Sequence, residues 1–147
     1  MQLKTENLYY KNMFMNSIND VSNLTVSDSE DEIEFDISYE EDENSNKTYS
    51  IKANGQELVA DNFQNFYADF VGIQCSDFST TKISAKADAT VTFTFHDGSK
   101  SVVEFFKSND TQYQYRINDI DMGKITSSAF NKMLKNVKSV AAGDEFK

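Results

Sequence analysis

The chain has 147 residues, a formal net charge of −10 and a sequence pI near 4.5. This charge disfavours binding to nucleic acids and to anionic membrane surfaces, because both carry negative charge themselves. The single cysteine, Cys75, excludes an internal disulfide, and 5 glycines with no proline argue against linker-rich or collagen-like classes.

The first part of the chain predicts an N-terminal arm and a first β-rich repeat. Residues 1–20 show little periodicity, and we expect them to pack against the body as an arm. Residues 21–75 contain two strictly alternating stretches, which is the pattern of strands with one face on a core. Their apolar positions are Ile33, Phe35, Ile37 and Tyr39, and then Tyr49, Ile51 and Ala53. Asn54-Gly55 predicts a hairpin turn, because both residues tolerate positive φ.

An amphipathic helix is expected to end this first repeat. Asp61 suits the N-cap position, and Gly72 suits the C-terminal end. The spacing of the apolar residues between them fits one helical face. Those residues are Phe63, Phe66, Tyr67, Phe70 and Val71.

A polar connector, residues 76–89, leads to a second β-rich repeat at 90–147. Threonines alternate with Val91, Phe93 and Phe95, and the following His96-Asp97-Gly98-Ser99 predicts a tight turn. A return strand, a tyrosine-rich strand and a last helix follow, with Thr126 or Ser127 as its N-cap. The apolar face of this helix comprises Phe130, Met133, Leu134, Val137 and Val140.

This order of elements predicts an α+β protein with antiparallel strands. The expected architecture is two β-meander-plus-helix repeats, with one helix ending each repeat. The repeats are expected to pack either as one compact unit or as two small subdomains, and their self-similarity suggests that each buries its apolar face against the other.

Catalytic and metal-binding patterns are sparse. His96, the only histidine, lies in a predicted turn, and Cys75 has no other base available, so we expect a turn residue and a buried thiol. One histidine and one cysteine are too few for a zinc site of nitrogen and sulfur ligands. The acidic runs near 28–36 and 40–43 lack the spacing of a calcium loop, and we expect solvated turns. We therefore expect no enzyme activity, no cofactor and no metal.

Tyr113, Tyr115 and Arg116 are the residues best suited to a small-ligand site. The tyrosines would line a groove if the sheet had an open face, and the only arginine would hold a carboxylate. The alternative for Arg116 is an exposed cross-strand partner of an acidic residue. A hydrolase that uses two carboxylates is a remaining alternative, although nothing places such a pair in a cleft.

One stretch resembles a known family. Tyr49-Ser50-Ile51-Lys52-Ala53-Asn54-Gly55-Gln56-Glu57-Leu58, followed by the aromatic helix, looks like the bacterial domain-of-unknown-function 4340 family. The later run Val91-Thr92-Phe93-Thr94-Phe95-His96-Asp97-Gly98 and its closing helix are similar to the same family. The resemblance covers roughly Val21 to Val140 and implies a domain anchored outside the cytoplasmic membrane, beside transporter components, with no known catalytic residue.

These observations predict a non-enzymatic extracytoplasmic module that mediates protein contacts in a bacterial envelope or transporter-associated assembly. The alternative is a module that binds a small ligand or cation between the two repeats. The chain shows neither a signal peptide nor a membrane-spanning stretch. If the resemblance holds, we expect the full-length protein to be membrane-anchored, and otherwise we expect it to be cytoplasmic.

Overall fold

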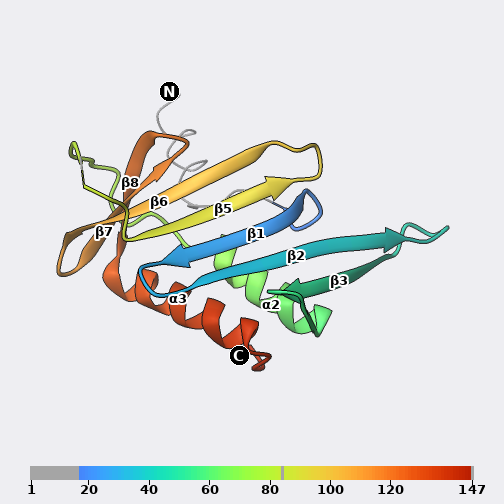
Figure 1. Cartoon of the computed structure of the whole chain (residues 1–147). Coiled ribbons are helices and arrows are strands. Elements are labelled where there is room, and N and C mark those ends of the chain that lie inside the picture. Colours follow the sequence, from blue (N-terminus) through green and yellow to red (C-terminus); the bar gives the residue numbers. More distant parts are fainter. Residues whose placement is uncertain (1–16, 84, 147) are drawn as a thin grey trace.

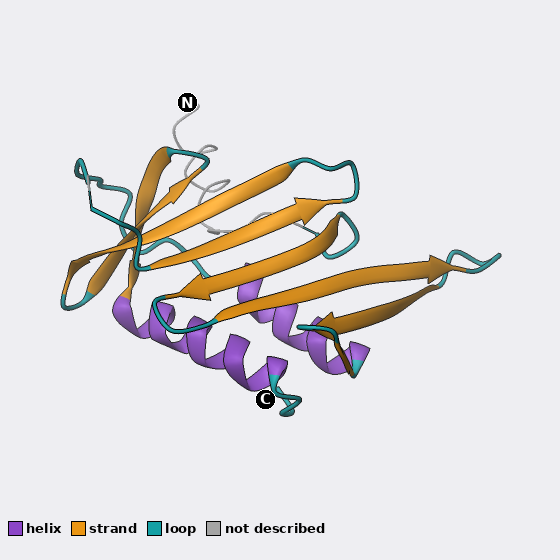
Figure 2. Ribbon diagram, in the orientation of Figure 1, coloured by secondary structure: helices purple, strands orange, loops and turns teal. Residues whose placement is uncertain are grey.

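The computed structural model of the chain describes residues 17–83 and 85–146, and these form one antiparallel sheet with two helices on one of its faces (Figures 1 and 2). The expected packing of the N-terminal arm falls largely on residues 1–16, which lie outside the described residues. The elements in chain order are β1 (Val21–Asp28), β2 (Glu32–Glu41), β3 (Lys47–Ala53), β4 (Gln56–Leu58), α2 (Ala60–Val71), β5 (Ala89–Phe95), β6 (Lys100–Asn109), β7 (Gln112–Ile117), β8 (Ile120–Thr126) and α3 (Ser127–Ala141).

All eight strands belong to one sheet, in the order β4-β3-β2-β1-β5-β6-β7-β8. Its centre is the antiparallel pair β1 and β5, which runs from Val21 opposite Phe95 to Asp28 opposite Ala89. The prediction of two β-meander-plus-helix repeats, each ended by a helix, is therefore wrong: the architecture is one sheet of meandering strands. The physical reason is that β1 and β5 would each leave an unpaired edge in a separate sheet, and pairing them satisfies both edges.

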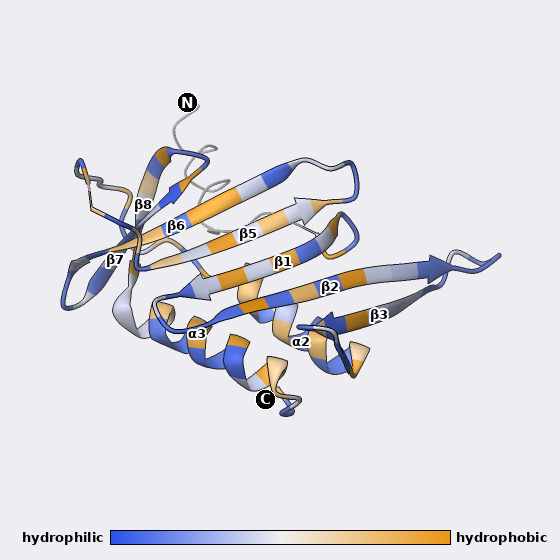
Figure 3. Cartoon of the chain, in the orientation of Figure 1, coloured by the Kyte–Doolittle hydropathy of each residue, from blue (hydrophilic) through white to orange (hydrophobic). Residues whose placement is uncertain are grey.

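The core lies between the sheet and the two helices, and it is largely aromatic. Phe35 on β2 is fully buried, and its ring centroid lies 5.1 Å from that of Phe63 and 6.0 Å from that of Phe66, both on α2. On the side of the core covered by α3, the ring centroids of Phe105 on β6 and Phe130 on α3 lie 5.4 Å apart. Apolar residues alternate with polar ones along the strands, as Figure 3 shows. The alternating stretches thus place one face of the sheet on the helices, as predicted.

Tight turns connect neighbouring strands. Asn54 and Gly55 have φ values of 49° and 86° between β3 and β4, which confirms the predicted hairpin. Asn118 and Asp119, with φ values of 49° and 69°, make the equivalent turn between β7 and β8. A short polar side chain supports the left-handed conformation there without glycine.

The two helices begin differently. The N-cap of α2 is Val59, which offers no side-chain hydrogen bond, so the prediction of Asp61 as the cap is wrong. Asp61 instead lies in the first turn, where its negative charge suits the positive end of the helix dipole. At α3, Thr126 is the cap, and its hydroxyl accepts a hydrogen bond from the backbone N–H of Ala129 at 3.1 Å.

An ion-pair cluster joins α3 to the turn between β1 and β2. The Lys138 ammonium lies 3.1 Å from Asp28, 3.5 Å from Asp31 and 4.0 Å from Glu30. The Asp28 carboxylate also accepts backbone N–H groups of Glu30 and Asp31, each at 2.8 Å. Burial raises the pKa of Asp28, but these donors together with Lys138 outweigh it, so that the pKa lies below its ordinary value of 3.8.

Replacing Asp28 with asparagine is expected to lower the free energy of unfolding by about 1 kcal/mol at neutral pH. Because the folded-state pKa is depressed, this contribution is fully present above pH 3.8, the unfolded value, and is lost as the pH falls through the folded pKa. Urea titrations at several pH values measure the difference between the two proteins. Glu30→Gln is the control, since that side chain is 79% exposed and should cost almost nothing. A difference that persists well below the folded pKa would contradict the prediction.

Candidate functional site

The structure separates the three residues proposed from the sequence as ligand-binding candidates. Tyr115 is 1% exposed and lies in the core, where burial and then contact with Cys75 raise its pKa. Tyr113 stacks on Phe130 with a centroid distance of 3.8 Å. Arg116 lies on the opposite face of β7, and its guanidinium is 4.7 Å from the centroid of the Phe106 ring. Tyr115 and Arg116 therefore lie on opposite faces of β7, and the role of the three residues in ligand binding stays a prediction.

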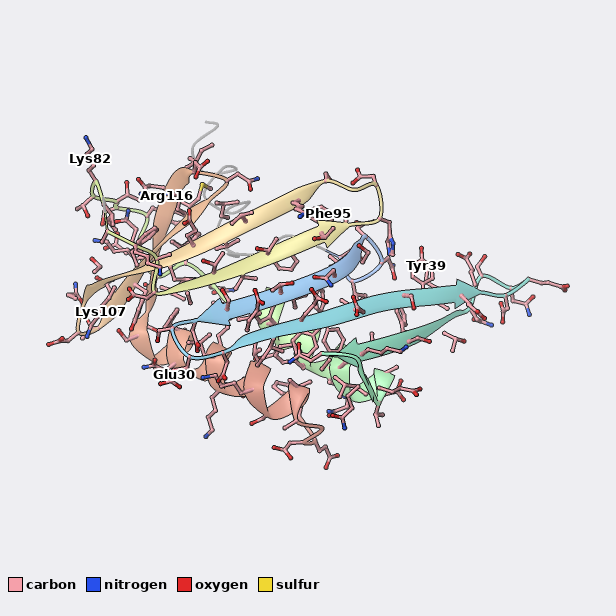
Figure 4. All side chains as sticks on the ribbon, in the orientation of Figure 1. Glu30, Tyr39, Lys82, Phe95, Lys107 and Arg116 are labelled. Carbon is pink, nitrogen blue, oxygen red and sulfur yellow. The ribbon has the colours of Figure 1, made fainter. Side chains whose placement is uncertain are left out.

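Arg116 instead helps to hold the connector, residues 76–89, against the sheet. Its side chain donates to the carbonyl of Ile83 and to the Asp121 carboxylate on β8, both at 3.1 Å. Beside it, the fully buried Gln114 accepts from the backbone N–H of Thr81 at 2.9 Å and donates to the carbonyl of Thr81 at 2.8 Å. Figure 4 shows Arg116 near the part of the connector that carries Lys82. These contacts give Arg116 and Gln114 a structural role.

Replacing Gln114 with alanine is expected to release the connector. The backbone N–H and carbonyl of Thr81 would both lose the Gln114 side chain as partner, and each hydrogen bond of this kind contributes about 0.5–1.5 kcal/mol. Because proteolysis follows the free energy of local opening, cleavage by trypsin after Lys82 should become about tenfold faster. Gln56→Ala, at an exposed position on β4, should leave the rate unchanged. Equal rates in the two variants would contradict the assigned role of Gln114.

Cys75 and His96 are not brought together. The Cys75 thiol is 8% exposed and donates to the carbonyl of Asp77 at 3.2 Å, beside β8. His96 follows β5 in the turn to β6, as predicted, and its backbone N–H donates to the carbonyl of Asp20 at 3.0 Å. Within residues 17–83 and 85–146, no group of three or more His, Cys, Asp or Glu side chains is arranged to hold a metal ion.

The best candidate site is an open hollow of about 810 Å³ at one end of the sheet. At this end β2 continues beyond the start of β1, since Asn23 on β1 already pairs with Asp36 on β2. The turn between β5 and β6 meets the segment before β1 nearby. We call this feature the end hollow. Its lining comprises Asn19, Asp20, Ser38, Tyr39, Glu41, Phe95, His96 and Asp97.

Aromatic rings make one part of the end hollow. The Tyr39 ring lies edge-on to His96 with a centroid distance of 6.0 Å, and it is tilted against Tyr49 at 5.5 Å. The Tyr49 hydroxyl donates to the side-chain oxygen of Asn19, which ties β3 to the segment before β1. Phe95 belongs to the end of β5 (Figure 4). The β2–β3 hairpin and the end of β5, which are distant in sequence, therefore bring their rings together at this end of the sheet.

Carboxylates make the other part. Asp20, Glu41 and Asp97 all line the end hollow, and its lining within residues 17–83 and 85–146 includes no lysine or arginine. The hydroxyl of Ser99 and then its backbone N–H hold the pKa of Asp97 below its ordinary value, so this carboxylate is charged at neutral pH. Rings next to carboxylates favour a cationic or mixed cationic and apolar group. The protein shows the same chemistry internally, because the Lys47 ammonium lies 5.8 Å from the Tyr39 ring centroid.

Sequence reasoning missed this site. The local pattern predicts Tyr39 only as the last apolar member of an alternating strand, and His96 only as a turn residue. The local signal present in the sequence is the position of Tyr39 directly before the acidic run at residues 40–43. The closeness of Asn19 and Asp20 to both segments depends on the β1–β5 pairing, which no local pattern predicts.

Comparisons with protein-family models, with curated proteins and with solved structures gave no match to this chain. The resemblance to the domain-of-unknown-function 4340 family therefore stays a prediction. Neither helix in the described part of the chain is long and apolar enough to cross a membrane.

Proposed function

We propose that this chain is a non-enzymatic protein-binding module of a bacterial envelope assembly, located outside the cytoplasm, and that the end hollow receives the partner. The observation that carries the proposal is the composition of that hollow, in which aromatic rings and the His96 imidazole adjoin three carboxylates, and in which the described lining residues include no lysine or arginine. Such a surface suits a partner segment that presents lysine or arginine beside apolar residues.

The shape of the end hollow supports a macromolecular partner. Its volume of about 810 Å³ lies at the upper end of small-molecule sites, but the hollow is open rather than enclosed. It adjoins the β2–β3 hairpin, which projects beyond the helices (Figure 1). A site on a projecting element is accessible to another protein.

The experiment is site-specific photocrosslinking in the bacterial cells that produce the protein. A photoreactive phenylalanine analogue at Tyr39 should give one adduct of defined mass, which mass spectrometry identifies. The matched control places the same analogue at Lys135, an exposed position on α3. An adduct at position 39 alone supports the proposal, whereas no adduct at position 39, or equal adducts at both positions, would refute it.

A second candidate function is binding of a small organic cation, which the pairing of Tyr39 and His96 with the surrounding carboxylates also favours. Calorimetry with tetramethylammonium and spermidine tests this function directly. Binding that Tyr39→Ala abolishes would favour this second function, and heats indistinguishable from dilution would remove it.

A further inference from the structure

The two edges of the sheet are finished differently. On the β8 edge, the connector covers the strand: Ser76 and Asp77 exchange backbone hydrogen bonds with Lys124. On the other edge, β4 has only three residues and pairs with Ile51–Ala53 of β3. Residues 47–50 of β3 therefore form the outer edge of the sheet there, and we call this segment the free β3 edge.

The hydrogen-bond parity of β3 shows which main-chain groups point outward along this edge. The backbone N–H of Asp42 donates to the carbonyl of Asn46, and that of Asn54 donates to the carbonyl of Glu34. Bonding between antiparallel strands alternates, so the even-numbered residues of β3 bond to β2 and the odd-numbered residues face away from it. Ile51 and Ala53 use these outward groups to bind β4.

Lys47 and Tyr49 consequently direct their N–H and carbonyl groups away from the sheet. Within the described residues these groups have no backbone or side-chain hydrogen-bond partner. One common protection of such an edge is a lysine side chain that extends across it. Here the Lys47 ammonium lies over the Tyr39 ring instead, so its charge does not block the edge.

The surroundings of the free β3 edge indicate what it would bind. Exposed carboxylates of Glu40, Glu41, Asp42 and Glu43 lie on the same hairpin. Leu58 pairs with Ile51, and this is the last β3–β4 pair before the free β3 edge begins. The next residue, Val59, is an apolar side chain that is 71% exposed. An added strand would thus meet negative charge and an apolar side chain. A second copy of this chain, with its net charge of −10, is a poor match.

We propose that the free β3 edge accepts an extended basic segment of a partner protein as an additional strand. The inference rests on the proposed function, whose partner it describes in more detail. Main-chain hydrogen bonds to Lys47 and Tyr49 supply the register, and lysine or arginine side chains of the segment face the acidic hairpin. The end hollow lies beside this strand, because Tyr39 pairs with Tyr49.

Hydrogen exchange of backbone amides tests the inference with a defined probe, a synthetic peptide of alternating lysine and valine about eight residues long. On addition of the peptide, the amides of Lys47 and Tyr49 should exchange at least about tenfold more slowly. The amides of Thr48 and Ser50 already bond to β2, so their rates should change much less. Equal protection of all four amides, or of none, would overturn the inference.

A pair of variants distinguishes the contribution of the Lys47 backbone N–H to peptide binding from that of the Lys47 side chain. Lys47→Pro removes the outward N–H group, which the β2–β3 ladder does not use, and should abolish peptide binding. Lys47→Ala removes the same charge but keeps the N–H group, and should bind at least as well as the original protein. Thermal unfolding of both variants checks that the hairpin still folds. Equal binding by the two variants would contradict edge pairing.

Two results distinguish this inference from the proposed function. Crosslinking at Tyr39 that is unaffected by Lys47→Pro would remove the edge inference and leave the proposed function intact, whereas absence of any crosslink would remove the proposed function itself. Analytical ultracentrifugation tests self-association through the same edge. A dimer of the original protein that Lys47→Pro converts to a monomer would show that a second copy of this chain occupies the edge, and would overturn the inference.

Discussion

Replacing Phe35 with alanine is expected to lower the free energy of unfolding by about 3–5 kcal/mol, the range for large aromatic residues removed from a core. Phe35 is fully buried at the centre of the contact between the sheet and α2, where it touches the rings of Phe63 and Phe66. The cavity left behind would lie between rigid elements that cannot close it easily. Since small domains are stable by about 5–15 kcal/mol, the variant should be only marginally folded.

Chemical denaturation followed by circular dichroism measures this loss. Phe78→Ala is the matched control, because the same substitution there removes a side chain that is 45% exposed. The control should lose less than about 1 kcal/mol. A loss at Phe35 no larger than at Phe78 would mean that the aromatic layer does not carry the stability assigned to it.

Replacing Gly123 with alanine is the second large effect, with an expected loss of about 1–3 kcal/mol from overpacking. A Cβ atom at this position on β8 would lie 2.7 Å from the sulfur of Cys75 and 2.8 Å from the carbonyl oxygen of Asp77. That carbonyl accepts the backbone N–H of Lys124 at 2.7 Å. Moving it would break the bond that covers the edge of β8, so the connector should exchange its amide hydrogens faster as well.

A second substitution tests the cause. Cys75→Ala in the Gly123→Ala background removes the sulfur but leaves the Asp77 carbonyl in place. The double variant should therefore recover only part of the lost free energy of unfolding, as measured by urea titration. Full recovery would show that the thiol alone opposes the added methyl group, and no recovery would assign the whole conflict to the backbone.

Local features were largely predictable from the sequence. The alternation around Phe35, the turn at Asn54-Gly55 and the apolar face that includes Phe130 all depend on neighbouring residues. Asp61 shows a limit even here: a good capping residue stood near the start of α2, but the helix begins at Ala60 because β4 leads almost directly into it.

The single sheet was not predictable in the same way. The β1–β5 pair joins residues from distant parts of the chain, and each strand alone fits equally well beside any other strand of similar pattern. Gln114 gives a second example: in the sequence it is one more polar residue of an alternating strand. Only the path of the connector, which places Thr81 against it, makes it a fully buried anchor.

The candidate site shows a mixed outcome. The alternation that placed Arg116 opposite Tyr115 also implies that Tyr113 and Tyr115 share the face of the core, so a shared ligand site was already difficult to build from all three residues. The end hollow is built from a strand and a turn that local sequence patterns predict, but their proximity depends on contacts between residues distant in the sequence. Its aromatic residue on β2 and its turn residue after β5 become neighbours only once the sheet is complete.

The central position of the β1–β5 pair has a consequence for how the chain acquires its structure. Val21 pairs with Phe95, so the central β1–β5 pair of the sheet forms only after residues 89–95 have left the ribosome. Until then β1 presents a bare edge to other nascent chains. Such non-local pairing slows folding and prolongs exposure to aggregation. Synthesis at low temperature, or together with chaperones, should therefore raise the yield of native protein, because both protect the bare edge of β1 until β5 can pair with it.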